Sequence, residues 1–230
     1  MKFKSNAYTQ VSGSVGGSTF SHNSGGMYVR ARTIPVDPQT AAQQVVRGFL
    51  AVLASAWQNT LTAIQRDAWT LYGLNVPLPD SLGDPTPVKG LPMYIRCNLP
   101  RLQAGMARVD DGPTIFSMPP NFQGAVVAAE GDPAAITYTW TALDEAWDGE
   151  LGAALLTFTS RQMSPTINFF KGPFRTTAPV LGAAVAITSP QSRDSDFSGT
   201  AANIMYVRTL VTRADGRLSA ERIFRQILQP

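Results

Sequence analysis

The chain has 230 residues and a mass of 24.7 kDa, enough for one large domain or two modest ones. The single cysteine, Cys97, excludes an intrachain disulfide framework and a cysteine-based zinc cluster. The single histidine, His22, excludes histidine-rich metal sites and most catalytic triads. The sequence has no run of about 18 apolar residues and no ordinary secretory signal, so we expect neither a membrane span nor export by that route.

Charge is scarce and segregated along the chain. Charged residues make up only 15% of the sequence, which favours a surface covered by partner subunits because charges are depleted at interface cores. A general shortage of charges is the alternative. Residues 1–66 hold six basic residues and one acidic residue, whereas residues 111–160 hold seven acidic residues and no lysine or arginine. Such opposite segments would pair copies or neighbours head to tail, unless the distribution is a local accident.

Residues 1–36 are predicted to form an extended N-terminal arm. Strand-forming residues at Phe20–Ser21 and Met27–Ile34 flank the turn-type cluster Asn23–Gly26, which predicts a hairpin. Because two strands alone bury little, the arm needs a sheet or a partner. We predict that the residues of its subunit interface include Phe20, Tyr28, Val29, Arg30, Arg32 and the more distant Arg47.

The glycines of the arm do not form a phosphate-binding loop. A P-loop needs a lysine followed by Ser or Thr at the start of a helix, and the segment Gly13–Ser18 has neither the lysine nor the helix. No βαβ unit follows, as a dinucleotide-binding fingerprint would require. Small residues here instead permit close approach of the backbone to a neighbour.

Residues 37–111 are predicted to be helical. We place Asp37 as the N-cap and Pro38 as the first residue of an amphipathic helix that runs to about Gln58. Apolar residues recur through this segment at helical spacing, which supports the assignment.

A second and a third helix are expected in the same region. Thr62–Gln65 has the pattern of a capping box that opens the second helix, and the short link predicts an antiparallel helical hairpin with Trp57 and Trp69 near its interface. A short helix is expected over Leu91–Leu99, ended by Pro100.

Residues 112–230 are predicted to form an antiparallel β-sandwich domain of immunoglobulin or fibronectin type, which gives the chain an α+β fold. Strand-forming runs alternate with Gly, Pro, Asn and Asp clusters at the spacing of such a sandwich. The cluster Ala214–Arg217 between the last two runs predicts a hairpin turn. The runs are Ala125–Ala129, Ile136–Trp140, Leu155–Thr159, Val180–Ile187, Ile204–Thr212 and Leu218–Leu228.

A tripeptide of tyrosine, Val or Ile, and arginine occurs three times, at Tyr28–Arg30, Tyr94–Arg96 and Tyr206–Arg208. We expect these copies to lie in a strand, a helix and a strand. We therefore interpret their recurrence as coincidence.

No catalytic or metal site is predicted, so we expect a protein that is not an enzyme and has no cofactor. The acidic run Asp144–Glu150 could suggest a glycosidase, but that chemistry needs two carboxylates facing each other across a cleft about 5–10 Å wide. The run also lacks the EF-hand spacing for calcium. An alternative function is carbohydrate binding, with Trp140 and Trp147 as the glycan-contact candidates.

Nucleic-acid binding is a further alternative. The sequence pI is about 9.2, and Arg30, Arg32 and Arg47 with Tyr28 could contact phosphates and stack on bases. The six cations of residues 1–66 are few for a dedicated binder, and no lysine- or arginine-rich stripe accompanies them. We rank this function below protein–protein assembly.

Several short motifs are spread over about half of the chain and contain no catalytic signature. They are Gly13–Gly17, Tyr28–Arg30, Pro35–Thr40, Gln43, Arg47, Trp57, Leu61–Thr62, Gln65–Arg66 and Ala68–Trp69, followed by Ser160–Arg161, Asn168–Pro173 and Ala214–Ser219. Together these motifs resemble uncharacterised virion structural proteins of tailed bacteriophages and prophages.

The resemblance implies a structural component of the virion. We expect a multi-copy accessory protein that decorates or cements the capsid or lies at the head–tail neck, assembled in the host cytoplasm through its N-terminal arm. Its partners would be major capsid, neck or tail subunits and copies of itself. The alternatives are an adhesin module of the phage particle and a DNA-binding internal virion protein.

Overall fold

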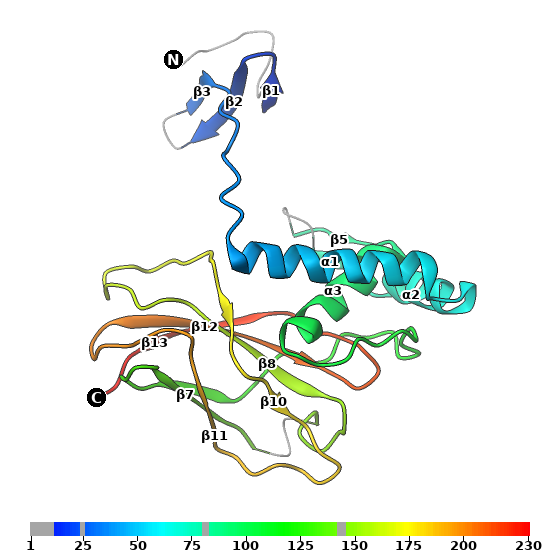
Figure 1. The fold of residues 1–230 in the computed structure, drawn as a ribbon, viewed down its shortest axis with the longest axis vertical. Coiled ribbons are helices and arrows are strands. Elements are labelled where there is room, and N and C mark those ends of the chain that lie inside the picture. Colours follow the sequence, from blue (N-terminus) through cyan, green and yellow to red (C-terminus); the bar gives the residue numbers. More distant parts are fainter. Residues whose placement is uncertain (1–11, 24–25, 80–82, 142–145) are drawn as a thin grey trace. The chain divides into compact units, whose positions relative to one another are not determined.

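The computed structural model describes residues 12–23, 26–79, 83–141 and 146–230. The chain divides into two compact units, Met1–Gln43 and Gln44–Pro230. The described residues form three α-helices and several antiparallel sheets (Figure 1), which confirms an α+β fold.

The first unit contains a three-stranded antiparallel sheet. Its strands β1 (Gly13–Val15), β2 (Ser18–Asn23) and β3 (Gly26–Ala31) are paired in chain order. The predicted hairpin is confirmed by the pairing of β2 with β3, in which Phe20 lies opposite Val29. Part of the predicted turn, residues 24–25, lies outside the described residues.

Helix α1 (Ala41–Asn59) begins later than the sequence predicted. The Thr40 amide donates to Oε1 of Gln43 at 3.1 Å, and the Gln43 amide donates to Oγ1 of Thr40 at 3.4 Å. These reciprocal bonds make Thr40 the cap, so the assignment of Asp37 as N-cap was wrong. Asp37 instead accepts a local hydrogen bond from the Gln39 amide at 3.2 Å.

Helix α2 (Ala63–Asn75) begins where it was predicted. The Thr62 amide donates to Oε1 of Gln65 at 2.9 Å, and the Gln65 amide donates to Oγ1 of Thr62 at 3.3 Å. Two of the four amides that a helix start leaves without partners are thereby satisfied. The predicted capping box is confirmed.

Helix α3 (Gly90–Gln103) continues through Pro100, so the predicted end at Leu99 was wrong. A proline inside a helix removes one backbone hydrogen bond. The next residue, Arg101, is buried and makes hydrogen bonds to other parts of the second unit, which hold the last turn in place. Tertiary contacts thus outweigh the local penalty of the proline.

The helices meet on α3. Helix α2 packs against α3, and the ring of Tyr94 on α3 lies 5.6 Å from Trp57 of α1 and 5.5 Å from Trp69 of α2, measured between ring centroids. Both tryptophans therefore lie at one interface, which is built on the third helix. The prediction that the first two helices pair as an antiparallel hairpin was wrong, because α2 packs mainly against α3 and not along α1.

The remaining strands of the second unit form two main antiparallel sheets and a two-stranded ribbon. The larger sheet has the order β10 (Val180–Leu181), β8 (Ala154–Thr159), β12 (Ile204–Thr212) and β13 (Arg222–Ile227), and β9 (Arg175–Thr176) also pairs with β8. The smaller sheet has the order β11 (Gln191–Asp194), β7 (Ala135–Thr139) and β6 (Ala125–Ala128), and the ribbon pairs β4 (Leu78–Pro79) with β5 (Pro85–Thr86).

Five of the six predicted runs appear as strands β6, β7, β8, β12 and β13. The run Val180–Ile187 supplies only the two residues of β10, and β9 and β11 were not predicted. The hairpin between β12 and β13 is confirmed, because the Arg213 amide donates to the Arg217 carbonyl at 2.9 Å and Gly216 has a φ of +86°.

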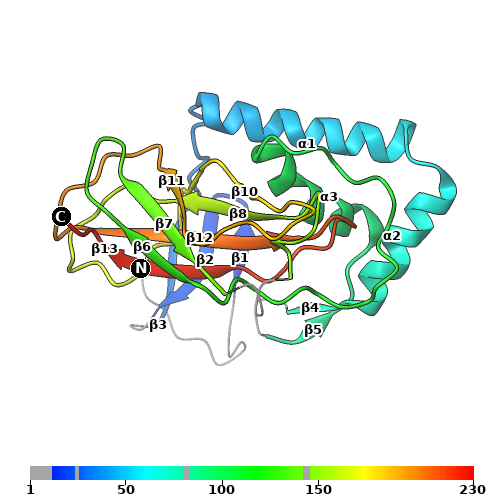
Figure 2. The same ribbon diagram turned by 90° about the horizontal axis from the view of Figure 1, so that it is seen from below.

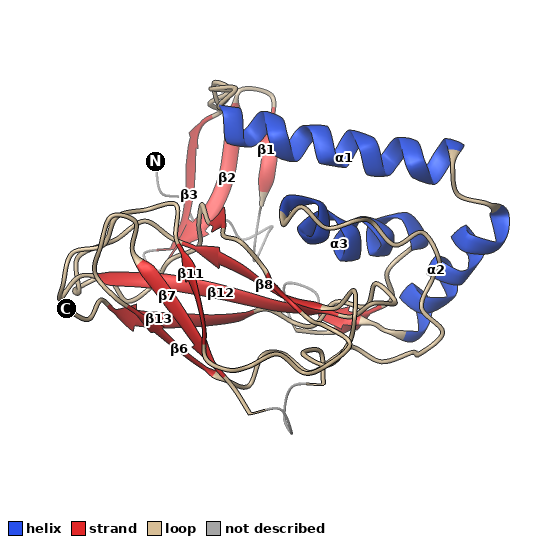
Figure 3. Cartoon of the chain, turned by 60° about the horizontal axis from the view of Figure 1, so that its bottom comes forward, coloured by secondary structure: helices blue, strands red, loops and turns tan. Residues whose placement is uncertain are grey.

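The central strands β8 and β12 are buried along nearly their whole length, and Figure 2 shows β7 of the smaller sheet crossing β12. Leu155 and Val207 pack with Ile136 of the smaller sheet in one core. Leu156 and Leu210 belong to a second core, together with Trp69, Tyr94 and Cys97 from the helices. Figure 3 shows α2 and α3 beside one end of these strands. The predicted helical region 37–111 and the β region 112–230 therefore share a core.

Candidate functional site

The sheet of the first unit has two chemically different faces. Residues paired across antiparallel strands point to the same side, and neighbours along a strand point to opposite sides. The register places Phe20 with Val29, and Val15 with Ser18 and Ala31, on one face that also carries Met27 and its partner His22 and that is mainly apolar. The opposite face carries Ser14, Thr19, Ser21, Tyr28 and Arg30.

This sheet has no core of its own among the described residues. None of residues 12–22 and 26–43 is buried. Val15 is 74% exposed, and beyond the sheet Ile34 and Val36 are 81% and 90% exposed. Strands of three and six residues gain their stability from an apolar face packed against something else.

The structure brings together five of the six predicted interface residues on or beside this sheet. Phe20 and Val29 are cross-strand partners on the apolar face, and both are half-buried. Tyr28 and the exposed Arg30 lie on the opposite face. Arg32 directly follows β3, and its amide donates to the Gly17 carbonyl at 2.9 Å.

Arg47 lies apart from those five residues in the sequence and belongs to the other unit. It is exposed on α1, within Gln44–Pro230. That it takes part in the same interface stays a prediction.

The two glycan-contact candidates are core residues. Trp140 is 6% exposed and Trp147 is 1% exposed, and their ring centroids lie 5.3 Å apart. The Trp140 indole N–H donates to Oδ2 of the buried Asp148 at 3.0 Å. A sugar-stacking platform needs an exposed ring face, so the assignment of these two tryptophans to glycan contact was wrong.

The described part of the acidic run serves the fold. Asp148 accepts the Trp140 hydrogen bond, and Glu150 pairs with the guanidinium of Arg213. Glu150 also accepts from the Ala214 amide at 2.9 Å. These carboxylates fix the ends of strands and turns, while Asp144 and Glu145 lie outside the described residues.

The single cysteine is a small core residue, as its apolar surroundings in the sequence suggested. Cys97 is buried in the helix-side core. Burial raises the pKa of its thiol to about 11, because the thiolate is disfavoured away from water. Cys97 is thus protonated near neutral pH, which is the opposite of what a nucleophilic cysteine requires.

Neither a metal cluster nor a membrane span is found within the described residues. No three His, Cys, Asp or Glu side chains of that part of the chain are grouped to hold an ion. Its helices are all too short or too polar to cross a bilayer. No protein-family model, curated protein or solved structure matches the chain.

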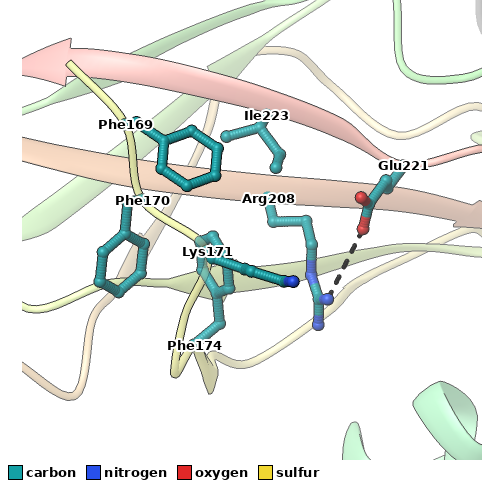
Figure 4. Close-up of a pocket in the computed structure, with 7 residues that line it drawn as sticks. All are labelled: Phe169, Phe170, Lys171, Phe174, Arg208, Glu221 and Ile223. Atoms are coloured by element: carbon teal, nitrogen blue, oxygen red, sulfur yellow. Dashed lines mark ion pairs between the residues drawn. The ribbon is translucent and has the colours of Figure 1, made fainter. Parts of the chain in front are cut away.

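Sequence reasoning missed a pocket of about 360 Å³ in the second unit (Figure 4). A signal for it was present, because Arg208 is the one charged residue in the strand run Ile204–Thr212. The pocket is lined by Phe169, Phe170, Lys171, Phe174, Arg208, Glu221 and Ile223.

Proposed function

We propose that the protein is a structural component of a bacteriophage particle. It would be a multi-copy accessory subunit that decorates or cements the capsid or joins the neck between head and tail. Its partners are major capsid, neck or tail subunits and further copies of itself. The motifs between Gly13 and Trp69 that resemble phage virion proteins support this proposal.

The observation that carries the proposal is the arm sheet, which has an apolar face but no buried residue among those described. Ordering a chain segment costs conformational entropy, which burial of apolar surface must offset. A neighbouring subunit can supply that burial by packing on the apolar face or by adding a strand to β1 or β3, the two edges of the sheet.

In this proposal the second unit supplies the folded body of the subunit. Its two main sheets share a core that includes Val126, Tyr138 and Val211. We propose that they form a sandwich of immunoglobulin or fibronectin type, whose outer surface faces solvent or neighbouring subunits. The protein would be assembled in the host cytoplasm and would remain in the virion.

Removal of residues 1–36 tests the role of the arm. This cut leaves the Thr40–Gln43 cap of α1 intact. We expect the truncated chain to fold and to unfold at the melting temperature of the full chain, because no described residue before Gln44 is buried. We also expect it to be absent from virus particles purified from the native host. Incorporation at the level of the full chain would overturn the proposal.

A matched pair of substitutions tests which face of the sheet is used. Phe20→Asp places a charge on the apolar face, and Thr19→Asp places the same charge on the opposite face. We expect Phe20→Asp to reduce incorporation at least ten-fold more than Thr19→Asp. The reverse order would assign docking to the face that carries Tyr28 and Arg30.

A second candidate function is that of a DNA-binding protein inside the virion, because Arg30 and Arg32 are both exposed. Retention of the full chain on duplex DNA that falls steeply with salt, and that is lost in the double variant Arg30→Gln/Arg32→Gln, would favour that function. Salt-independent behaviour together with loss of incorporation on truncation would favour assembly between proteins.

A further inference from the structure

An arginine interrupts the apolar row of the central strand. Residues two apart along a strand point to the same face, so Ile204, Tyr206, Arg208 and Leu210 share one face of β12. Ile204 and Tyr206 belong to one buried apolar cluster, and Leu210 belongs to the helix-side core. A residue that departs from the local pattern of a strand in this way is expected at a functional or a strained site.

The Arg208 guanidinium is enclosed by aromatic rings. Its carbon Cζ lies 4.4 Å from the centroid of the Phe158 ring and 5.0 Å from that of Phe174. Phe158 is its cross-strand partner on β8, and Ile223 is its partner on β13. Stacking holds the planar group in place but supplies no acceptor for its N–H groups.

The hydrogen-bonding capacity of Arg208 is unmet within the described residues. Its Nε is buried and has no partner there. Nη1 lies 3.6 Å from Oε2 of Glu221, which is longer than a hydrogen bond, and the Glu221 side chain is 56% exposed. A buried donor without an acceptor is costly, and more so when it is charged. The site therefore favours an added acceptor.

The pocket around Arg208 combines positive charge with an apolar wall. Lys171 lines the same pocket, and in Figure 4 its side chain extends toward the guanidinium. Two cations thus face a single carboxylate, that of Glu221. The remaining lining is formed by Phe169, Phe170, Phe174 and Ile223, and the volume of about 360 Å³ lies at the small end for ligand sites.

We propose that this pocket binds an acidic side chain carried by an apolar segment of another protein. The planar carboxylate meets the fork of Arg208 and the ammonium of Lys171, and the flanking apolar groups pack on Phe169 and Ile223. Glu221 acts as a loose internal counter-ion that swings into solvent when the ligand enters.

The apolar lining distinguishes this ligand from a phosphate or a nucleic acid. A dianionic phosphate is held by several converging donors, whereas one half-buried guanidinium and one exposed ammonium suit a single carboxylate. The pocket lies wholly within Gln44–Pro230, so the inference does not rest on the arm or on its docking.

The test is a titration of the full chain, followed by nuclear magnetic resonance, with the blocked peptide acetyl-Leu-Glu-Phe-amide. The same peptide with Gln in place of Glu is the control ligand. We expect the acidic peptide to bind at least about five-fold more tightly than its neutral analogue, as for a partly exposed ion pair. Equal affinity of the two peptides would overturn the proposal.

Variants at the rim give a test that does not depend on removing the half-buried Arg208. Glu221→Gln removes the competing carboxylate and should tighten binding about three-fold, whereas Lys171→Ala should weaken it by a similar factor. The matched controls, Asp194→Asn and Lys89→Ala, change exposed charges outside the pocket and should have no effect. Weaker or unchanged binding in Glu221→Gln would contradict the assignment.

A second ligand identifies the source of the carboxylate. The probe 3-phenylpropanoate carries the same acid on an apolar body without a peptide backbone. Binding weaker than that of the acidic peptide supports a protein partner. Binding at least as tight would show that the pocket takes a free carboxylic acid, and would overturn the assignment to a protein segment.

Discussion

The side chain of Arg101 fixes the end of α3 to the strands, and its substitution tests how the helices are held there. Its guanidinium donates through Nε to the Ala107 carbonyl at 3.1 Å and through Nη2 to the Gly152 carbonyl at 3.2 Å. Nη1 donates to Oγ1 of Thr212 at 2.9 Å and to the Arg213 carbonyl at 3.1 Å. One side chain thus connects the end of α3 to the loop after it, to the start of β8 and to the end of β12.

The substitution Arg101→Met keeps most of the apolar stem and removes these four hydrogen bonds. Each hydrogen bond to a charged group contributes about 1.5–3 kcal/mol, and each acceptor left unsatisfied in the interior costs a similar amount. The desolvation of the guanidinium, which also lowers the pKa of Arg101, offsets several kcal/mol of that total. We expect a net loss of about 3 kcal/mol, or about 6–12 °C in melting temperature for a unit of this size.

The assay is urea and thermal unfolding of the full chain, followed by circular dichroism. Arg225→Met is the matched control, because Arg225 is exposed and donates one hydrogen bond, to the Pro165 carbonyl at 2.7 Å. We expect the control to change the free energy of unfolding by less than about 1 kcal/mol. Equal stabilities of the two variants would refute the idea that Arg101 fixes α3 to the sheets.

Two further predictions concern a glycine and the cysteine. Gly216→Ala should lower the free energy of unfolding in urea by about 1–2 kcal/mol, because the φ of Gly216 is +86° and a Cβ there would lie 3.1 Å from Cβ of Val109. The control Gly149→Ala should leave the free energy of unfolding nearly unchanged, because a Cβ at Gly149 would enter open space. Cys97 should stay unreactive toward a thiol reagent at pH 8 until urea unfolds the chain. Its pKa is raised to about 11, so between about pH 9 and pH 11 the folded state keeps a thiol proton that the unfolded state loses. Its contribution to stability is therefore complete below about pH 9 and falls as the pH rises toward 11. Rapid labelling of the native protein would contradict the burial of the thiol.

Local patterns in the sequence predicted those features that depend on neighbouring residues. The capping box at Thr62 and the hairpin turn at Ala214–Arg217 involve contacts within three or four positions, so the sequence carries the whole signal. The start of α1 was misplaced because two caps compete there. Asp37 followed by Pro38 has the pattern of a helix start, but Thr40 and Gln43, three residues apart, form the capping box that begins α1.

Features that depend on long-range packing could not be predicted from local patterns. Trp140 precedes the acidic run Asp144–Glu150 and Trp147 lies within it, yet the core of the two sheets encloses both rings. Similarly, Arg208 stood out only as a charge in a strand. Its pocket forms because the register of β12 with β8 places it beside Phe158, and because Phe174 arrives from another loop.

The two units differ in what stabilises them, and this difference predicts that the proposed docking of the arm can be lost without a loss of stability. The second unit contains two apolar cores joined through β8 and β12, so its folding free energy comes from its own contacts. The described part of the first unit has no buried residue to contribute such energy, and any burial gained from a partner appears as binding free energy instead. Arg101→Met should therefore lower the melting temperature without altering the proposed docking surface of the arm. Phe20→Asp should weaken the proposed docking and leave the melting temperature unchanged.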